Sequence, residues 1–142
     1  MELKESIRKR RIGVMLTLIS LAAIASIFEY GRIEQWNIML QITEIILFVV
    51  FVVSLVLTFL RTGLWRFTHK PLKYLDEREI ALTSKSLRYA YAFFAVIVLI
   101  LLLSFSLLER PVHIVIVVSL ILFAHLLPAA VIAWTEKQIK EF

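Results

Sequence analysis

Glu44 is the one acidic residue inside a long apolar stretch of the sequence, so its type and position could support chemistry. An ionised carboxylate is costly in hydrocarbon, and we therefore expect this side chain to face protein or water. On a helix, Gln41 and Thr58 fall within a narrow arc of Glu44 and make one polar stripe. The stripe could hold a proton, a cation or a ligand. It could equally be a hydrogen-bonded packing contact near the outer end of the helix.

Histidine is the second residue type that could carry chemistry. His125 lies well inside another apolar stretch, where it could be a ligand or a hydrogen-bonded contact between helices. His113 and His125 are on one predicted helix, about 18 Å apart, and cannot clamp one iron. No haem or other cofactor is therefore expected, and His69 is expected to be solvated.

Two serines extend the candidate intramembrane polar site to a third apolar stretch. Ser104 and Ser106 lie near its outer end, at a depth where they could meet the Glu44 side chain in a four-helix bundle. Because lipid offers no hydrogen bond, we expect the polar groups of spanning helices to turn toward one another. The predicted site therefore consists of Gln41, Glu44, Ser104, Ser106 and His125.

An acidic run at residues 76–79 could suggest a divalent metal site. Consecutive helical positions point in different directions, so its carboxylates do not converge well on one ion. Asp76 followed three residues later by Glu79 is instead the pattern of a capping box at a helix start. We interpret the pair as a helix cap and expect neither a metal site nor a catalytic residue.

The elements that position these residues follow from composition. The chain has 142 residues, of which 61% are hydrophobic, with a mean hydropathy of +0.88. A membrane-spanning helix needs roughly 20 apolar residues. The continuous apolar runs predict an all-α polytopic membrane protein with one membrane domain, residues 1–142, and not a barrel of alternating strands. The four predicted spans are Ile12–Phe28, Trp36–Leu60, Tyr89–Leu108 and Val112–Trp134.

The spans form two predicted helical hairpins, residues 1–60 and 89–142, joined by a basic connector at residues 61–88. Glu29–Gln35 is the expected loop of the first hairpin, broken at Gly31. Pro71 is expected to interrupt any helix that continues from the second span. A helix from Asp76 to Leu108 would be about 50 Å long, against about 30 Å for a bilayer core. It should therefore project from the membrane or bend near Thr83–Ser86.

Charge predicts the orientation. All but two of the 16 Lys and Arg residues lie in the N-terminal segment, the connector or the C-terminal tail, the exceptions being Arg32 and Arg110. The positive-inside rule places both termini and the connector in the cytoplasm, in the cell inner (cytoplasmic) membrane. Anionic inner-leaflet lipids are expected partners, as are further copies of the chain or another membrane protein. Nucleic acid is not an expected partner, because the basic residues flank the predicted membrane spans.

Small residues and a shared spacing suggest how the helices pack. Gly13, Thr17 and Ser20 could line a close helix contact, within the chain or in a dimer. The two hairpins also match at an offset of 80 residues, with Ser26 aligned to Ser106 and Gly31 to Pro111. A parallel internal repeat would explain this match. Convergence would explain it as well, because any such hairpin needs a basic start, a span and a polar turn.

The segment LDERE at residues 75–79, shortly before a span, resembles small prokaryotic four-span integral membrane proteins of unknown function. That resemblance covers about Leu75–Ala95 and implies no site. The chain is similar to small multidrug transporters in size and span count, but their essential glutamate lies in the first span. With no cysteine and no catalytic motif, we expect a non-enzymatic accessory, scaffold or regulatory subunit. The alternative is a small oligomeric ion, proton or solute transporter or channel that uses Glu44.

Overall fold

The computed structural model describes residues 2–135, with no account of the side chains of residues 2–5, 66–68 and 72. Every regular element in that range is helical. The chain divides into two compact units, with the division between Gly63 and Leu64. The predicted polar tail after Thr135 lies outside the described residues. Each unit is a helical hairpin and is described by itself.

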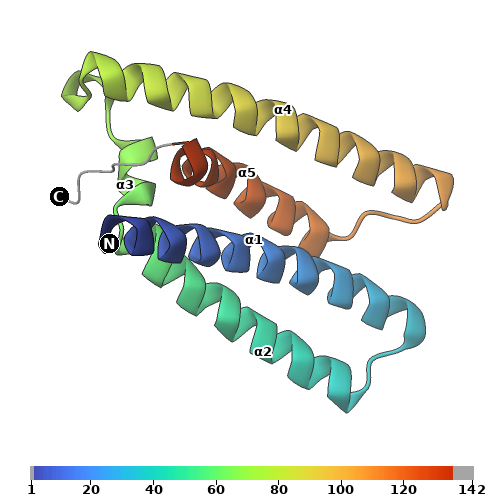
Figure 1. Ribbon diagram of the computed structural model, residues 1–142. Coiled ribbons are helices and arrows are strands. Elements are labelled where there is room, and N and C mark those ends of the chain that lie inside the picture. The colour runs from blue at the N-terminus through green and yellow to red at the C-terminus, as the bar shows by residue number, and fades with distance from the viewer. Residues whose placement is uncertain (1, 136–142) are drawn as a thin grey trace. The chain divides into compact units, whose positions relative to one another are not determined.

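The first unit is a hairpin of two long helices (Figure 1). Helix α1 runs from Glu2 to Glu34, so the basic N-terminal segment and the first span are one continuous helix. Helix α2, Ile38–Leu55, passes directly into a π-helical segment, η1, Val56–Leu60. Asn37 caps α2, accepting a hydrogen bond from the Leu40 N–H at 2.9 Å.

The predicted loop Glu29–Gln35 was wrong, because α1 continues through Gly31 to Glu34. An Arg32–Glu29 ion pair of 3.0 Å supports this last turn on the helix surface. Gly31 does not end the helix but allows the Trp36 ring to pack closely against it, because a Cβ at this position would lie 2.9 Å from Cε2 of Trp36. The reversal is made by Gln35, whose φ of 67° is left-handed.

Small and hydroxyl side chains form the seam between α1 and α2. Thr17, Ser20, Ser54 and Thr58 are all buried there, beside Val14, Leu21, Phe51 and Phe59. At Gly13, the space that a Cβ would fill is occupied by the Thr58 hydroxyl, and Cβ of Thr58 would be only 3.2 Å away. Small residues let the two helices approach this closely. The packing within the chain that the small residues predicted is present.

The connector contains two short helical segments. After η1 the chain turns at Gly63, whose φ is +73°, and enters α3, Leu64–His69. Pro71 follows α3 and precedes a 3₁₀ turn, η2, Leu72–Tyr74. The helix of the second span has already ended before Gly63, so it does not continue as far as Pro71.

Helix α4 runs without interruption from Glu77 to Leu107. The predicted capping box is present: the Glu79 N–H donates to Asp76 Oδ1 at 2.7 Å, and the Asp76 N–H donates to Glu79 Oε2 at 3.2 Å. At the other end, Glu109 has a φ of 52°. The Glu109 N–H bonds the Ser106 carbonyl at 3.1 Å and the Arg110 N–H bonds the Phe105 carbonyl at 3.0 Å. This is a Schellman motif, which ends the helix without a glycine.

Helix α5, Ile114–Thr135, packs against α4 and α3 to complete the second unit. Its last three turns supply most of its buried residues, from Leu126 to Ala133. On α4 the buried positions are Thr83, Ser86 and Ala90. The apolar residues Ile80, Leu87 and Tyr91 also recur at helical spacing on α4, but all three are exposed. The helix packs through its small residues, because these allow close contact with α5.

Four helices of the described chain are long and apolar enough to cross a membrane: Ser6–Glu34, Ile38–Leu60, Glu77–Leu107 and Ile114–Thr135. The all-α class is confirmed, and each of the four predicted spans corresponds to one of these candidate membrane-spanning helices. The aligned pair Gly31 and Pro111 play different roles, however, one inside α1 and the other in the turn after α4. That difference disfavours the repeat interpretation.

Candidate functional site

Glu44 lies on the face of α2 that continues toward Phe51, Ser54 and Thr58, three of the buried positions of the seam. Its side chain is half-buried. Its Oε2 atom is shielded from solvent and has no hydrogen-bond partner. Gln41, one of the groups expected within reach of Glu44, is exposed and makes no hydrogen bond with this oxygen.

The register of the hairpin explains why Glu44 has no partner on α1. Thr17 is paired with Ser54, and Gly13 faces Thr58. Continuing this antiparallel register places Glu44 at the level of Ile27. Side chains near that level on α1 include Ile24 and Phe28, which offer no hydrogen bond. A carboxylate in such surroundings must be protonated, hydrated or paired with a group from elsewhere.

Two of the other predicted site residues, Ser104 and His125, bond within their own helices. The Ser104 hydroxyl donates to the Ile100 carbonyl at 2.8 Å. His125 Nδ1 lies 2.8 Å from the Ile121 carbonyl, which can only accept, so Nδ1 carries a proton. Ser104, Ser106 and His125 are all exposed side chains. Their local bonds account for them as helix-surface groups and require no shared ligand.

Among the described residues, no three His, Asp or Glu side chains come together as a metal site. The acidic residues at the start of α4 illustrate why. Asp76 and Glu79 are engaged with each other's backbone N–H, and Glu79 is also 3.8 Å from Lys70 Nζ. The pair therefore acts as a helix cap, as the spacing predicted.

Aromatic and basic residues pair along the connector. The rings of Trp65 and His69 are stacked with centroids 4.1 Å apart, and His69 Nδ1 bonds the Trp65 carbonyl at 2.9 Å. Lys73 Nζ lies 4.7 Å from the centre of the Tyr74 ring. Rings and cations interleaved beside a span are typical of a membrane–water interface.

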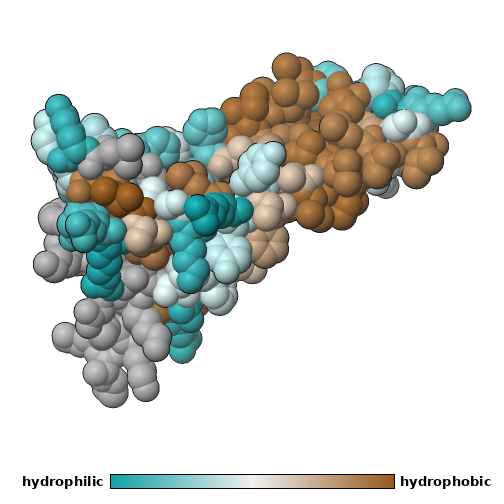
Figure 2. All heavy atoms as spheres, turned by 90° about the horizontal axis from the view of Figure 1, so that it is seen from above, coloured by the Kyte–Doolittle hydropathy of each residue, from teal (hydrophilic) through white to brown (hydrophobic). Residues whose placement is uncertain are grey.

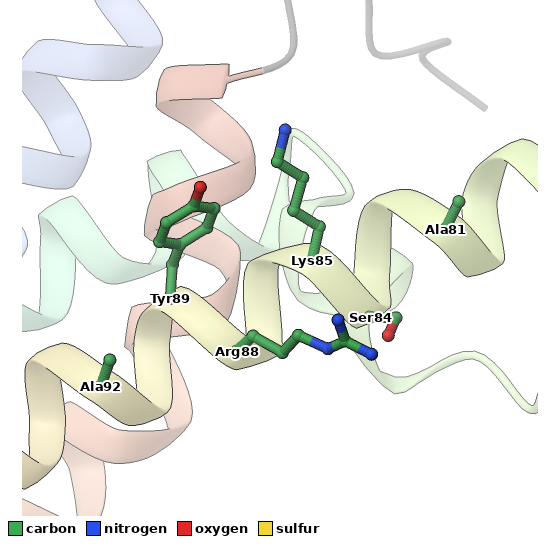
Figure 3. Close-up of a pocket in the computed structure, with 6 residues that line it drawn as sticks. All are labelled: Ala81, Ser84, Lys85, Arg88, Tyr89 and Ala92. Atoms are coloured by element: carbon green, nitrogen blue, oxygen red, sulfur yellow. The ribbon is translucent and has the colours of Figure 1, made fainter.

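An open hollow on the N-terminal half of α4 was not predicted from the sequence (Figure 3). Its volume is about 620 Å³. Two alanines leave the space, and longer polar side chains surround it, all on one helical face. The spacing of small and basic residues along that face was the signal that could have found it. The lining residues are Ala81, Ser84, Lys85, Arg88, Tyr89 and Ala92.

The fold thus defines an all-helical chain with four helices able to span a membrane, in two hairpins. No protein-family model, curated protein or solved structure matches the chain. Its function must be argued from its own residues.

Proposed function

We propose that this chain is a multi-pass integral membrane protein that acts as a non-enzymatic scaffold, accessory or regulatory subunit. Its partner would be another membrane protein or further copies of itself. We further propose that it resides in the inner (cytoplasmic) membrane with both termini and the connector in the cytoplasm. The distribution of Lys and Arg supports this orientation.

The observation that carries the proposal is the exposure of α4. Only 6% of its most apolar 18-residue window is buried. Its buried residues, Thr83, Ser86 and Ala90, all lie in its N-terminal half. Figure 2 looks onto this helix and shows apolar side chains along most of its length, with polar ones near its ends. Most of the outer half of α4 is therefore available to lipid or to another helix.

A cysteine scan tests this proposal directly, because the chain has no native cysteine. Single cysteines at exposed positions of the outer half of α4, such as Phe93, Ile100 and Leu107, would be cross-linked in native membranes. Helix partners should produce cross-links that recur every three to four residues along one face. Buried Ala90 provides the control, which should not cross-link. Uniformly low cross-linking, with every exposed position open to a lipid-phase quencher, would refute a partner on α4.

Glu44 supports a second candidate, a small oligomeric transporter or channel for protons, cations or a solute. The shielded Oε2 without a hydrogen-bond partner favours it, because unpaired carboxylates inside spans often lie on ion pathways. The test is flux into liposomes that contain the purified protein. Glu44→Gln should abolish flux while leaving helicity unchanged. No flux above that of empty liposomes would eliminate this candidate.

A further inference from the structure

The hollow on α4 combines positive charge with unoccupied space. Lys85 and Arg88 line it, one helical turn apart, together with Ser84 and Tyr89 (Figure 3). Neither cation has an ion pair or hydrogen bond with another residue of the described chain. In Figure 3 the Arg88 guanidinium lies beside Ser84, whereas the Lys85 side chain extends in another direction. Arg88 and Ser84 therefore offer adjacent donors to an anion, and Lys85 adds positive charge to the same region of α4.

The chemistry of the lining fits a phosphate group. Arg and Lys both donate to phosphate oxygens, and the guanidinium can do so with two parallel bonds. The Ser84 hydroxyl adds a neutral donor, and Tyr89 has the amphipathic ring that is enriched where headgroups meet the hydrocarbon. The four groups lie on two successive turns of one helix, so the backbone brings them to one face of α4.

An apolar track leads away from the hollow along the same face of α4. It begins at Ala92 and continues through Val96, Leu99 and Leu103, which are 56%, 61% and 54% exposed. The rise from Ala92 to Leu103 is about 16 Å, and one leaflet of the hydrocarbon core is about 15 Å thick. The track therefore matches one acyl chain in length.

We propose that this face of α4 is a binding site for one anionic phospholipid. Arg88 and Ser84 hold the headgroup phosphate in the hollow, and Lys85 adds positive charge beside it. An acyl chain lies along Ala92, Val96 and Leu103. Charge complementarity and the continuity of the hollow with the track favour a lipid over a free phosphate. The site does not depend on whether the protein is a scaffold or a transporter.

The test uses the full chain in phosphatidylcholine nanodiscs that contain a minor fraction of brominated phosphatidylglycerol. A fluorophore on Phe93→Cys, which is beside the track and 60% exposed, reports quenching by the brominated lipid. We expect local enrichment of phosphatidylglycerol on the order of ten-fold over its bulk fraction, because two basic side chains attract it. Lys85→Gln/Arg88→Gln should remove this enrichment.

Two control variants distinguish a defined lipid-binding site from general electrostatic attraction of anionic lipid. The matched variant Arg61→Gln/Lys73→Gln loses the same charge from exposed positions outside the hollow and should retain the enrichment. Ala92→Phe keeps every charge but fills the hollow, and this variant should lose the enrichment of phosphatidylglycerol. An equal loss in the Arg61/Lys73 variant, or none in Ala92→Phe, would overturn the proposal. Displacement of the lipid by an equal concentration of inorganic phosphate would assign the hollow to free phosphate instead.

Discussion

Thr17 of α1 donates a hydrogen bond to Ser54 of α2, with 3.0 Å between the two hydroxyl oxygens. The Ser54 hydroxyl in turn donates to the Phe51 carbonyl at 3.0 Å. Both side chains are buried, with 0% and 5% of their surfaces exposed. The first hairpin is therefore joined in its interior by a short chain of hydroxyl hydrogen bonds as well as by apolar contacts.

The first prediction concerns the strength of this hydrogen bond. Thr17→Val keeps the side-chain shape and removes the donor, and Ser54→Ala removes the acceptor. A double-mutant cycle on unfolding in detergent should give a coupling of about 0.6 kcal/mol, typical of bonds between membrane helices. Thr43→Val is the control, since the Thr43 hydroxyl bonds only the Met39 carbonyl on its own helix. A coupling near zero would mean that the seam is held by packing alone.

The second prediction concerns the close approach at Gly13. Gly13→Val should destabilise the hairpin by about 1–3 kcal/mol, because the added side chain would collide with Thr58 across the seam. The free energy of unfolding measures this effect. Combining Gly13→Ala with Thr58→Ala should recover part of the loss that Gly13→Ala causes alone, because the colliding hydroxyl is then absent. If the double variant were no more stable than Gly13→Ala, the contact would not be the cause.

The cap of α4 gives a third prediction. Asp76→Ala should reduce stability by about 1 kcal/mol, since the Glu79 N–H loses its acceptor. Hydrogen exchange at the first turn of α4 should quicken at the same time. Asp76→Asn is the matched control, because asparagine caps helices about as well. Fast exchange in the Asn variant too would show that charge, and not the cap, stabilises this turn.

Some of the structural features behind these predictions can be recognised in the sequence, and others cannot. The four spans and the Asp76–Glu79 box were predictable because they depend on composition or on neighbours a few residues apart. The end of α1 was not, since Gly31 looks like a breaker until the Trp36 ring is seen packed against it. The left-handed turn at Glu109 was equally hidden, because a non-glycine residue there is uncommon.

The candidate site shows the same division. That Glu44 is unusual follows from its type in an apolar run, but its surroundings follow from the register that Thr17 and Ser54 set between the helices. Sequence alone could not supply that register. The hollow on α4 is hard to predict from the sequence, because basic residues beside a span, such as Lys85 and Arg88, are expected as topology signals whether or not small residues lie next to them.

The proposed orientation leads to a fourth prediction, made with single cysteines in a chain that has none of its own. Glu34→Cys, at the end of α1, should react with an impermeant reagent from outside the cell. Ser84→Cys, on the connector side of α4, should react only after the membrane is opened. Both positions are exposed, so access to the reagent is controlled by the membrane. Labelling of both from one side would contradict the orientation.

Glu44 provides the last prediction. Its Oε2 is shielded and has no hydrogen-bond partner, and a buried polar atom without one costs about 1–3 kcal/mol. If the protein is a scaffold in which the Glu44 carboxylate has no functional role, Glu44→Leu should raise the free energy of unfolding by roughly that amount. Glu44→Gln should change it little, because the amide keeps the shape and leaves a polar atom in the same place. Unfolding of the purified protein in detergent measures both variants. A marked loss of stability in Glu44→Leu would contradict this account, because it would show that the carboxylate has a partner in the assembled protein, such as a second copy of the chain.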